Sequence, residues 1–255
     1  MYVAKSIQVL RRAARLLSSF DLSHPERGVT ELAQLLDLPK ATVHRILHTL
    51  ELDGLIQQND DNGKYHLGFE LAKLGLLALD RIDLRKEALP LLERLLEEHQ
   101  ETVDLAVFDD GQMFYLEVLE SPQPVKISAA AGRHLPAYCT ASGKAYLAYA
   151  GEAEFETVVR GGLQAHTPHT VRDPEQLQED LRLTRERGYS VSQEEYEKGI
   201  SAVAAPVIDT NNRPVAVIAI AGPSYRHGAE RIDELGCAAR EVARELSSHL
   251  GASLA

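Results

Sequence analysis

Two short helical segments, separated by only a few residues, constrain the fold of this chain more than any other feature. The first segment is ELAQLLD (31–37), which follows Thr30, a residue suited to capping a helix. After DLP, Pro39 is well placed as the first residue of a second helix, because its fixed φ suits that position. The apolar stripes of the two helices are Leu32, Ala33 and Leu36 in the first, and Val43, Ile46, Leu47 and Leu50 in the second.

The second helix presents a different face to solvent. At about 100° per residue, its outward residues are Ala41, His44, Arg45 and His48, with Lys40 and Thr42 on the flanks. Arg can hydrogen-bond the edges of guanine, and a small Ala can admit a thymine methyl group. Thr and Lys can hold phosphates. The pattern predicts a helix-turn-helix whose second helix enters the major groove, with Thr30 among the contacts.

A hairpin signal follows directly. LIQQ (55–58) and KYHL (64–67) are strand-like runs on either side of NDDNG, which carries the Asn-Gly turn pair. A hairpin in this place makes the module a winged helix, and Lys64 on the wing is a further candidate DNA contact. Before these two helical segments in the sequence, a further helix has the apolar stripe Ile7, Leu10, Ala14 and Leu17. The alternative, a small helical subdomain with a solvated charged face, accounts less well for this ordered set.

The remaining chain predicts a second domain of a different kind. Helical patterns continue through residues 68–82 and the following leucines. Strand-like runs follow at 102–110, 112–120, 124–131, 189–195, 200–210 and 213–223, with helical runs at 141–150, 152–160, 174–188 and 227–250. The tight turn DDGQ predicts that the first two strands are antiparallel. The pattern indicates an antiparallel α+β domain with helices packed on one side of the sheet.

Composition supports the division into two parts. Residues 1–50 carry seven Lys or Arg against four Asp or Glu, whereas residues 71–255 carry 19 against 29. A mildly basic head on an acidic body suits a DNA-binding module joined to a module of another function. No apolar run is long enough to span a bilayer, and the N-terminus lacks the features of a signal peptide. Cys139 and Cys237 suggest no disulfide framework, which favours a reducing cytoplasm.

The stretch PAYCTASGKAYLA (136–148) raises three enzymatic or metal-binding alternatives. Cys139 lacks a nucleophile signature around it, although His134, His166 and His169 occur in the chain. The segment Ser142-Gly143-Lys144 is not a phosphate loop, because Ala145 follows the lysine. The pair in HTPH (166–169) could hold a metal, but Pro168 favours a loop and no HExxH motif supports a zinc site. We therefore predict no catalytic residue, no metal and no cofactor.

The chain resembles the IclR family of bacterial transcriptional regulators along essentially its whole length. The head matches through TELAQLLDLPKATVHRILHTLELDGLIQQNDDNGKYHLG. The body matches through AGRHLPAYCTASGKAYLA, HTPHTVRDPEQLQEDLRLTRERGYSVSQEEYEKGISAVAAPVID and PVAVIAIAGPSYR. The resemblance implies that the helix holding Lys40 to Arg45 lies in the major groove. It also implies a GAF-like antiparallel sheet domain, flanked by helices, that binds an effector.

The resemblance also implies where the effector binds. Carried over residue by residue, the pocket positions are Ala141, Ser142, Ser192, Ser201, Ala202, Ala219 and Ala221. Family members typically have Asp in place of Ser192, Cys or Ser in place of Ala202, and often Ser or Thr in place of Ala219 and Ala221. Each buried polar group left unpaired costs about 1–3 kcal/mol, so the loss of these partners favours a less polar ligand. An organic acid with an aromatic or otherwise weakly polar body fits this expectation.

These inferences predict a ligand-responsive transcriptional regulator, most simply a repressor, and not an enzyme. Its expected parts are a winged helix-turn-helix DNA-binding domain at 1–67, a linker helix at 68–82 and an effector-binding domain at 83–255. Its expected partners are double-stranded, pseudo-palindromic operator DNA, a small-molecule effector and further copies of itself, as a homodimer or dimer of dimers. We expect a cytoplasmic, nucleoid-associated protein without membrane contact. The alternatives are a ligand-binding protein without a DNA function and a Cys- or Ser-dependent hydrolase.

Overall fold

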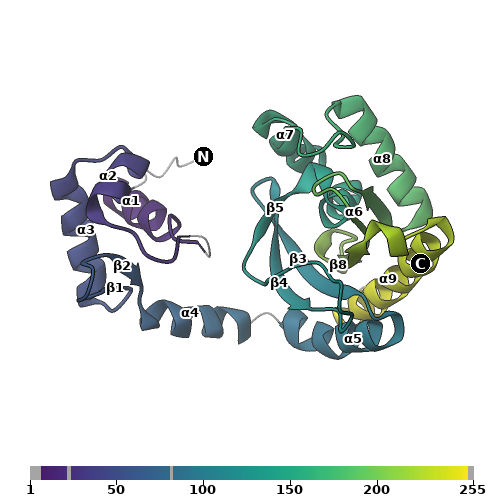
Figure 1. Cartoon of the computed structure of the whole chain (residues 1–255), viewed down its shortest axis with the longest axis horizontal. Helices are drawn as coiled ribbons and strands as arrows, with labels where there is room; N and C mark the ends of the chain where they lie inside the picture. The colour runs from purple at the N-terminus through teal and green to yellow at the C-terminus, as the bar shows by residue number, and fades with distance from the viewer. Residues whose placement is uncertain (1–6, 22–23, 81–82, 252–255) are drawn as a thin grey trace. The chain divides into compact units, whose positions relative to one another are not determined.

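The computed structural model describes residues 7–21, 24–80 and 83–251 of the chain. It divides into two compact units between residues 82 and 83, and each is described by itself. The first unit consists of α1 (Gln8–Leu17), α2 (Val29–Leu36), α3 (Lys40–Leu52), β1 (Ile56–Gln58), β2 (Tyr65–Leu67) and α4 (Phe69–Asp80) (Figure 1).

The helix-turn-helix is present, with its two helix starts shifted by one or two residues. The first helix begins at Val29 with Gly28 as its N-cap, so the prediction that Thr30 caps it is wrong. The second begins at Lys40, and Pro39 is its N-cap instead of its first residue. Asp37 ends α2 in the left-handed region, at φ 52°, which turns the chain sharply into α3. The predicted stripes of both helices lie in the core of this unit.

The face of the first helix that the sequence predicts to be buried is not the face that is buried in the structure. Ile7 and Leu10 are 64% and 63% exposed, whereas Leu16 is fully buried. Leu16 packs with Phe20 in the core, and Ala13 and Leu17 lie against it. The sequence offers two overlapping apolar stripes on this helix, and only contact with α2 and α3 selects between them. Ile7 and Leu10 of the predicted stripe stay exposed in the described unit, whereas Leu17 is partly buried.

The wing is a two-stranded hairpin held at both ends. β1 and β2 pair antiparallel with Ile56 opposite Leu67, and the amide of Asn59 donates to the carbonyl of Lys64 at 2.7 Å. Side-chain amides of Asn59 and Asn62 each donate to Glu26, both at 2.8 Å. The wing tip is therefore tied to the loop before α2, which fixes its orientation relative to the helix-turn-helix.

The second unit contains a six-stranded antiparallel sheet among the residues that the structure describes, in the order β5-β4-β3-β8-β7-β6. Its strands are β3 (Thr102–Asp109), β4 (Gln112–Leu119), β5 (His134–Pro136), β6 (Ser190–Gln193), β7 (Ile200–Ile208) and β8 (Pro214–Pro223). Its helices are α5 (Asp83–His99), α6 (Ala141–Tyr149), α7 (Glu152–Gly161), α8 (Pro174–Arg187) and α9 (Ala229–His249), with short 3-10 turns η1 (Ala137–Cys139) and η2 (Ser224–Arg226).

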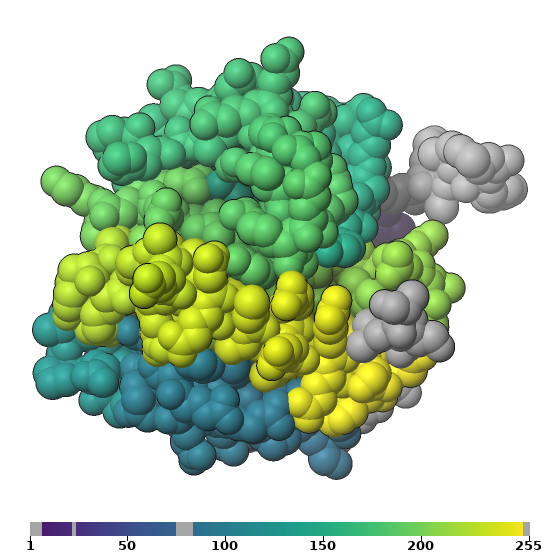
Figure 2. Space-filling view, turned by 90° about the vertical axis from the view of Figure 1, so that its right-hand side faces the viewer, coloured from purple at the N-terminus to yellow at the C-terminus, as the bar shows by residue number. Residues whose placement is uncertain are grey.

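Helices cover both faces of this sheet, not one as the sequence predicts (Figure 1). One face packs against α5 and α9 through residues such as Leu105, Val203 and Ile218. The other packs against α6 and α8 through residues such as Ala106, Ala204 and Val217. Figure 2 shows α9 (yellow) as a band between α5 (blue) and α8 (green). Because both faces are buried, the central strands are apolar at nearly every position, so alternation does not show which face is which.

One predicted strand does not form. Residues 124–131 are an irregular segment, and the short strand β5 lies after it at His134–Pro136. The segment leaves the sheet after β4 and rejoins it through the carbonyl of Arg133, which accepts from the amide of Tyr115 at 3.0 Å. Its apolar residues, which suggest a strand in the sequence, instead line a cavity in this unit.

Candidate functional site

The recognition face of α3 is free for a partner. Of the eight predicted DNA contacts, seven are exposed and Thr42 is half-buried. In the described residues, no ion pair involves the side chains of Lys40, Arg45 or Lys64. Unpaired, exposed cations beside small side chains are the groups that read base edges and hold phosphates. Lys64 lies on the wing directly after the Asn-Gly turn.

A basic surface on α1 escapes the sequence prediction. Arg11, Arg12 and Arg15 line a shallow groove with residues at the end of α2 and in the turn before α3. None of the three arginines forms an ion pair within the described part of the chain. The helical spacing of these residues is visible in the sequence, but their position beside the helix-turn-helix is a tertiary feature.

The second unit contains a cavity that opens to solvent, and the empty space within it and at its mouth amounts to about 680 Å³. Its walls are the start of α6, the cavity-side residues of β3, β6, β7 and β8, and the irregular segment at 127–129. Six of the seven predicted effector residues line it: Ala141, Ser142, Ser192, Ala202, Ala219 and Ala221. Residues from three separate stretches of sequence thus meet at one place.

Ser201 is the exception and does not line the cavity. Neighbouring residues on a strand point to opposite faces, so Ala202 and Ser201 cannot both face the ligand. The hydroxyl of Ser201 instead pairs with that of Ser224 at 2.9 Å on the other side of β7. We therefore remove Ser201 from the candidate effector residues.

The start of α6 is built by close packing. Thr140 caps the helix, since its hydroxyl accepts from the amide of Gly143 at 3.2 Å. No described residue accepts a hydrogen bond from the amides of Ala141 or Ser142. A Cβ on Gly143 would lie 2.0 Å from the carbonyl oxygen of Ala137, so only glycine lets η1 approach the helix. Two amides without a described acceptor therefore lie at the start of α6, and both of their residues line the cavity.

The enzymatic alternatives for this stretch do not fit the geometry. Cys139 is fully buried, and burial raises the pKa of its thiol to about 12, so the reactive thiolate does not form near neutral pH. Lys144 is also buried, and its ammonium lies 2.7 Å from Asp180 and 2.6 Å from Glu195. The lysine joins α6 to α8 and to the segment after β6. Its ammonium group is already paired with these two carboxylates, so it is not available to bind a phosphate.

The two histidines of HTPH do not form a metal centre with their neighbours. The ring of His166 lies 3.0 Å from the hydroxyl of Tyr138, and His169 is exposed. Across residues 7–21, 24–80 and 83–251, no group of three or more His, Cys, Asp or Glu side chains is arranged to hold a metal ion. In the same residues, no helix is long and apolar enough to cross a membrane.

The cavity also has polar residues that the sequence does not predict, among them Asp104, Tyr115, Arg133, Tyr196 and Glu197, and Asp104 is the most deeply placed of the acidic ones. It lies in the middle of β3, is 4% exposed and lines the cavity. Burial raises the pKa of its carboxyl group to about 8. The same carboxyl group adds to the burial that raises the pKa of the Tyr115 hydroxyl. The available signal was a lone acidic residue inside the apolar strand TVDLAVF.

Ser192 uses its hydroxyl within the protein. It donates to the carbonyl of Cys139 at 3.2 Å and so ties β6 to η1. Because Ala202, Ala219 and Ala221 offer only methyl groups, this wall of the cavity is smooth and apolar. Its polar groups are concentrated elsewhere, at Asp104, Tyr115, Arg133 and the start of α6.

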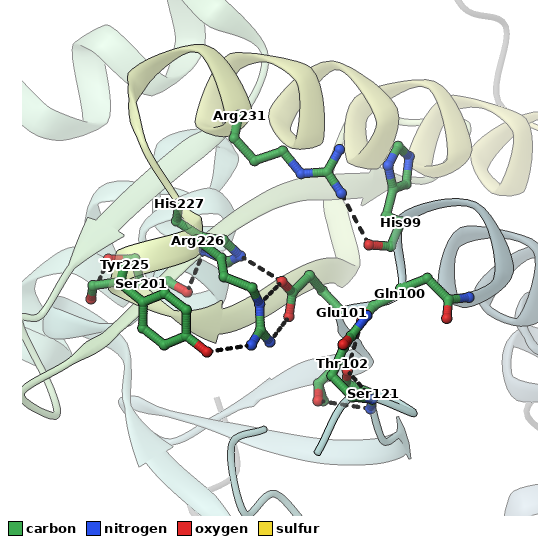
Figure 3. A network of polar contacts seen from close by, with 12 residues as sticks. His99, Gln100, Glu101, Thr102, Ser121, Ser201, Tyr225, Arg226, His227 and Arg231 are labelled. Atoms are coloured by element: carbon green, nitrogen blue, oxygen red, sulfur yellow. Dashed lines mark hydrogen bonds and ion pairs between the residues drawn. The ribbon is translucent and has the colours of Figure 1, made fainter. Parts of the chain in front are cut away.

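A polar network anchors the irregular segment that closes the cavity (Figure 3). Glu101, which lies just after α5, receives two hydrogen bonds from the Arg226 guanidinium, at 2.6 and 2.7 Å. The same guanidinium donates to the carbonyl of Val125 at 2.9 Å. Ser121 donates to the carbonyl of Gln100 at 2.6 Å. The network therefore connects the end of α5, the end of β8 and the segment that leads to residues 127–129.

Comparison with known proteins identifies both units. Residues 9–60 match the IclR helix-turn-helix domain, and residues 76–248 match the bacterial transcriptional regulator IclR C-terminal domain. The chain is 34% identical to the acetate operon repressor of Salmonella typhimurium over 252 residues, which is 98% of this chain and 92% of that protein.

Solved structures agree over the whole chain. An IclR transcriptional regulator from Alicyclobacillus acidocaldarius is 31% identical with a TM-score of 0.87, covering 97% of this chain and all of that one. An IclR homologue from Microbacterium hydrocarbonoxydans, solved in complex with 4-hydroxybenzoate, is 28% identical with a TM-score of 0.83. That likeness covers 96% of this chain and all of the other.

Proposed function

We propose a specific sensing role for this chain, which belongs to the IclR family of bacterial transcriptional regulators. As a member, it is a ligand-responsive DNA-binding regulator and not an enzyme. The role proposed is that of a repressor whose second unit binds a weakly polar organic acid. The observation that carries it is the meeting of six family-implied residues in one cavity of that unit.

The DNA-binding residues proposed are those of the exposed α3 face and the wing. Arg45 and His44 are assigned to base edges, and Lys40, Thr42 and Lys64 to phosphates. Ala41 is assigned to a thymine methyl group, with Thr30 and His48 at the margins. The exposed charges of Lys40 and Arg45 support this assignment, because neither side chain forms an ion pair in the described unit. Lys64 forms no ion pair either, although its charge helps to lower the pKa of the Glu26 carboxyl group.

A homodimer on a pseudo-palindromic operator is proposed for two reasons. One recognition helix contacts too few base pairs for strong specificity. In addition, large apolar side chains remain exposed in the described part of the first unit, at Ile7, Val9 and Leu10 on α1 and at Phe69 and Leu74 on α4. Exposed apolar groups of this kind are typical of an interface, and a second copy is the partner proposed. A dimer of dimers extends the same scheme.

The effector proposed is an organic acid with an aromatic or other weakly polar body. The two free amides at the start of α6 and the Arg133 guanidinium favour a carboxylate. The methyl groups of Ala202, Ala219 and Ala221 favour an apolar body. The bound 4-hydroxybenzoate of the Microbacterium hydrocarbonoxydans homologue supports the same class. Binding changes DNA affinity only if the acid prefers one of two arrangements of the protein, typically by about 1–3 kcal/mol.

A thermal-shift screen followed by gel-shift tests the proposal. The full chain is heated with organic acids that differ in size and polarity, and each compound that raises Tm is added to a gel-shift with the promoter next to the protein's own gene. Aromatic acids are expected to raise Tm and to release the DNA. A screen in which only two- or three-carbon oxoacids raise Tm contradicts the ligand class.

The rival classes of function have their own readouts. A ligand-binding protein without a DNA function gives no salt-sensitive shift on that promoter. A hydrolase releases product from a panel of esters and amides, and replacement of Cys139 by Ala abolishes the release. A nucleoid-associated cytoplasmic location is the one that suits a DNA-binding role.

A further inference from the structure

A buried carboxyl group in the cavity wall has no partner from the protein. Asp104 is 4% exposed, and its Oδ1 atom is fully enclosed. No described residue donates a hydrogen bond or forms an ion pair with either oxygen of this side chain. Buried polar groups in native proteins nearly always have a partner, so such an exception marks a place where a molecule outside the chain belongs.

The surroundings show why the protein leaves this group open. Directly opposite Asp104 on β8 is Ala219, and Ala204 follows on β7 in the same row. Methyl groups cannot donate a hydrogen bond. Arg133 lines the same cavity, but its guanidinium donates to the carbonyl of Ser128. Small residues beside Asp104 thus create space for a ligand without satisfying the carboxyl group.

The chemistry of a carboxyl group fixes what the missing partner must offer. Both the ionised and the protonated form keep at least one oxygen that accepts a hydrogen bond. A partner that donates a hydrogen bond therefore satisfies Asp104 in either form. A ligand without a donor leaves at least one buried carboxyl oxygen of Asp104 without a hydrogen bond in either form, which weakens the ligand's binding.

We propose that Asp104 determines effector specificity, and that the effector is an organic acid carrying a hydroxyl or amino group that donates a hydrogen bond to Asp104. The donor group lies at the end away from the ligand's carboxylate, because a carboxylate has no hydrogen to donate to Asp104. The carboxylate then lies by the amides of Ala141 and Ser142 or by Arg133. This inference rests on the proposed function, since it takes the cavity as the effector site.

The assignment changes how the alanine positions are understood. Ala202, Ala219 and Ala221 line the cavity from β7 and β8 and offer no hydrogen-bonding side chain. The hydrogen-bonding group is supplied from β3 instead of from β7 and β8. The ligand is therefore apolar along its body and polar at both ends.

Isothermal titration calorimetry on the full-length chain tests the proposal with matched compounds. The probes are benzoate and its derivatives with a hydroxyl, amino or methoxy group at position 3 or 4, together with aliphatic acids that differ in the same way. The best hydroxyl or amino compound is expected to bind ten- to a hundredfold more tightly than its unsubstituted and methoxy counterparts. Comparison of the hydroxyl and amino arms shows which donor the site takes.

Two variants attribute the preference to Asp104. In Asp104→Leu, the donor-bearing compounds lose their tenfold or greater advantage, because the acceptor is gone. Above pH 8, where the pKa of Asp104 leaves its carboxyl group ionised, the methoxy compounds gain at least several-fold in Asp104→Asn, because the amide can donate to them whereas a carboxylate cannot. The matched control is Asp110→Asn, in the exposed turn after the same strand, where the left-handed backbone at φ 42° suits Asn. The control is expected to keep the wild-type preference.

Several results overturn the inference. Equal binding of donor, methoxy and unsubstituted compounds to the wild type means that Asp104 does not select the ligand, as when a water molecule satisfies it. An unchanged preference for donor-bearing compounds in Asp104→Leu also means that Asp104 does not select the ligand. Failure of the whole panel to bind also overturns it, because the class of ligand is then wrong. The proposed function fails separately, when compounds that bind leave the DNA affinity unchanged.

Discussion

Asp104→Asn is expected to change the way in which the stability of the second unit depends on pH. In the folded chain, burial raises the pKa of Asp104 from 3.8 to about 8. Between these two values the folded state keeps a proton that the unfolded state has released. The folded state therefore binds more protons, and its stability falls as pH rises through this window. Below about pH 4 the effect of this residue vanishes, and above about pH 8 it is complete.

The size of the effect follows from the width of this window. One pKa unit corresponds to about 1.4 kcal/mol, so the residue lowers the free energy of unfolding by about 2 kcal/mol between pH 6 and pH 8. Asn does not titrate and removes this slope. Tyr115 and Cys139, which share the cavity, stay protonated in this range because burial raises the pKa of both. The other cavity groups that ionise, Arg133, Tyr196 and Glu197, are the same in both proteins, so their contributions cancel.

Urea denaturation followed by circular dichroism at pH 6, 7 and 8 measures the effect on both proteins. The difference in unfolding free energy is expected to shift by about 2 kcal/mol in favour of Asn across this range. Asp110→Asn, with its exposed side chain, is the control and is expected to run parallel to the wild type. Parallel curves for Asp104→Asn as well would refute the reasoning, because they mean that the carboxyl group is not desolvated.

Four further experiments have definite expected outcomes. Arg45→Ala is expected to reduce discrimination against a mismatched base pair by about 1–3 kcal/mol, whereas Lys64→Ala weakens binding to all sequences and lowers the salt slope by about one; fluorescence anisotropy at several salt concentrations separates the two. Gly143→Ala is expected to destabilise the second unit by about 1–3 kcal/mol or more, since its Cβ would lie 2.0 Å from a backbone oxygen, and an unchanged urea midpoint would contradict this packing. Lys144→Met leaves Asp180 and Glu195 facing each other without a cation, and it is expected to lower the free energy of unfolding by about 3–5 kcal/mol in urea denaturation. The control is Lys73→Met, which removes an exposed ion pair and is expected to be nearly neutral. Arg226→Ala is expected to raise amide hydrogen exchange in residues 122–130 at least tenfold, and no change there would mean that its bond to Val125 does not hold the segment.

Local patterns predict most of the first unit, and this has a physical reason. The stripes of α2 and α3 are short and unambiguous, and the Asn-Gly turn specifies the wing. The stripe of α1 is ambiguous, because Leu16 and Leu17 are adjacent and either can face inward. Only contact with other helices decides between them, which is why Ile7 and Leu10 were placed in the core incorrectly.

The cavity was predicted less completely, since its walls come from distant parts of the chain. A resemblance to a family predicts which sequence positions matter, but it does not predict which face of a strand each residue occupies. The prediction therefore includes Ser201 beside Ala202, although the two side chains point to opposite faces of the sheet. Asp104 was missed because its meaning depends on Ala219, which lies 115 positions further along the sequence but directly opposite in the sheet. The prediction of a strand at residues 127–129 is wrong because apolar character indicates that a segment is buried but does not show which structure covers it.

The buried cross-link at Lys144 has a consequence for how a bound effector can act. It fixes α6 to α8 and to the segment after β6, so the helix start that faces the ligand cannot shift without breaking two buried ion pairs. The opposite wall, at residues 127–129, has no ladder of backbone hydrogen bonds and depends on the contacts of Arg226 and Ser121. A ligand in this cavity therefore contacts one wall that is held by ion pairs and another wall that is held by fewer contacts. The second wall, at residues 127–129, is connected to the end of α5 through Arg226 and Glu101.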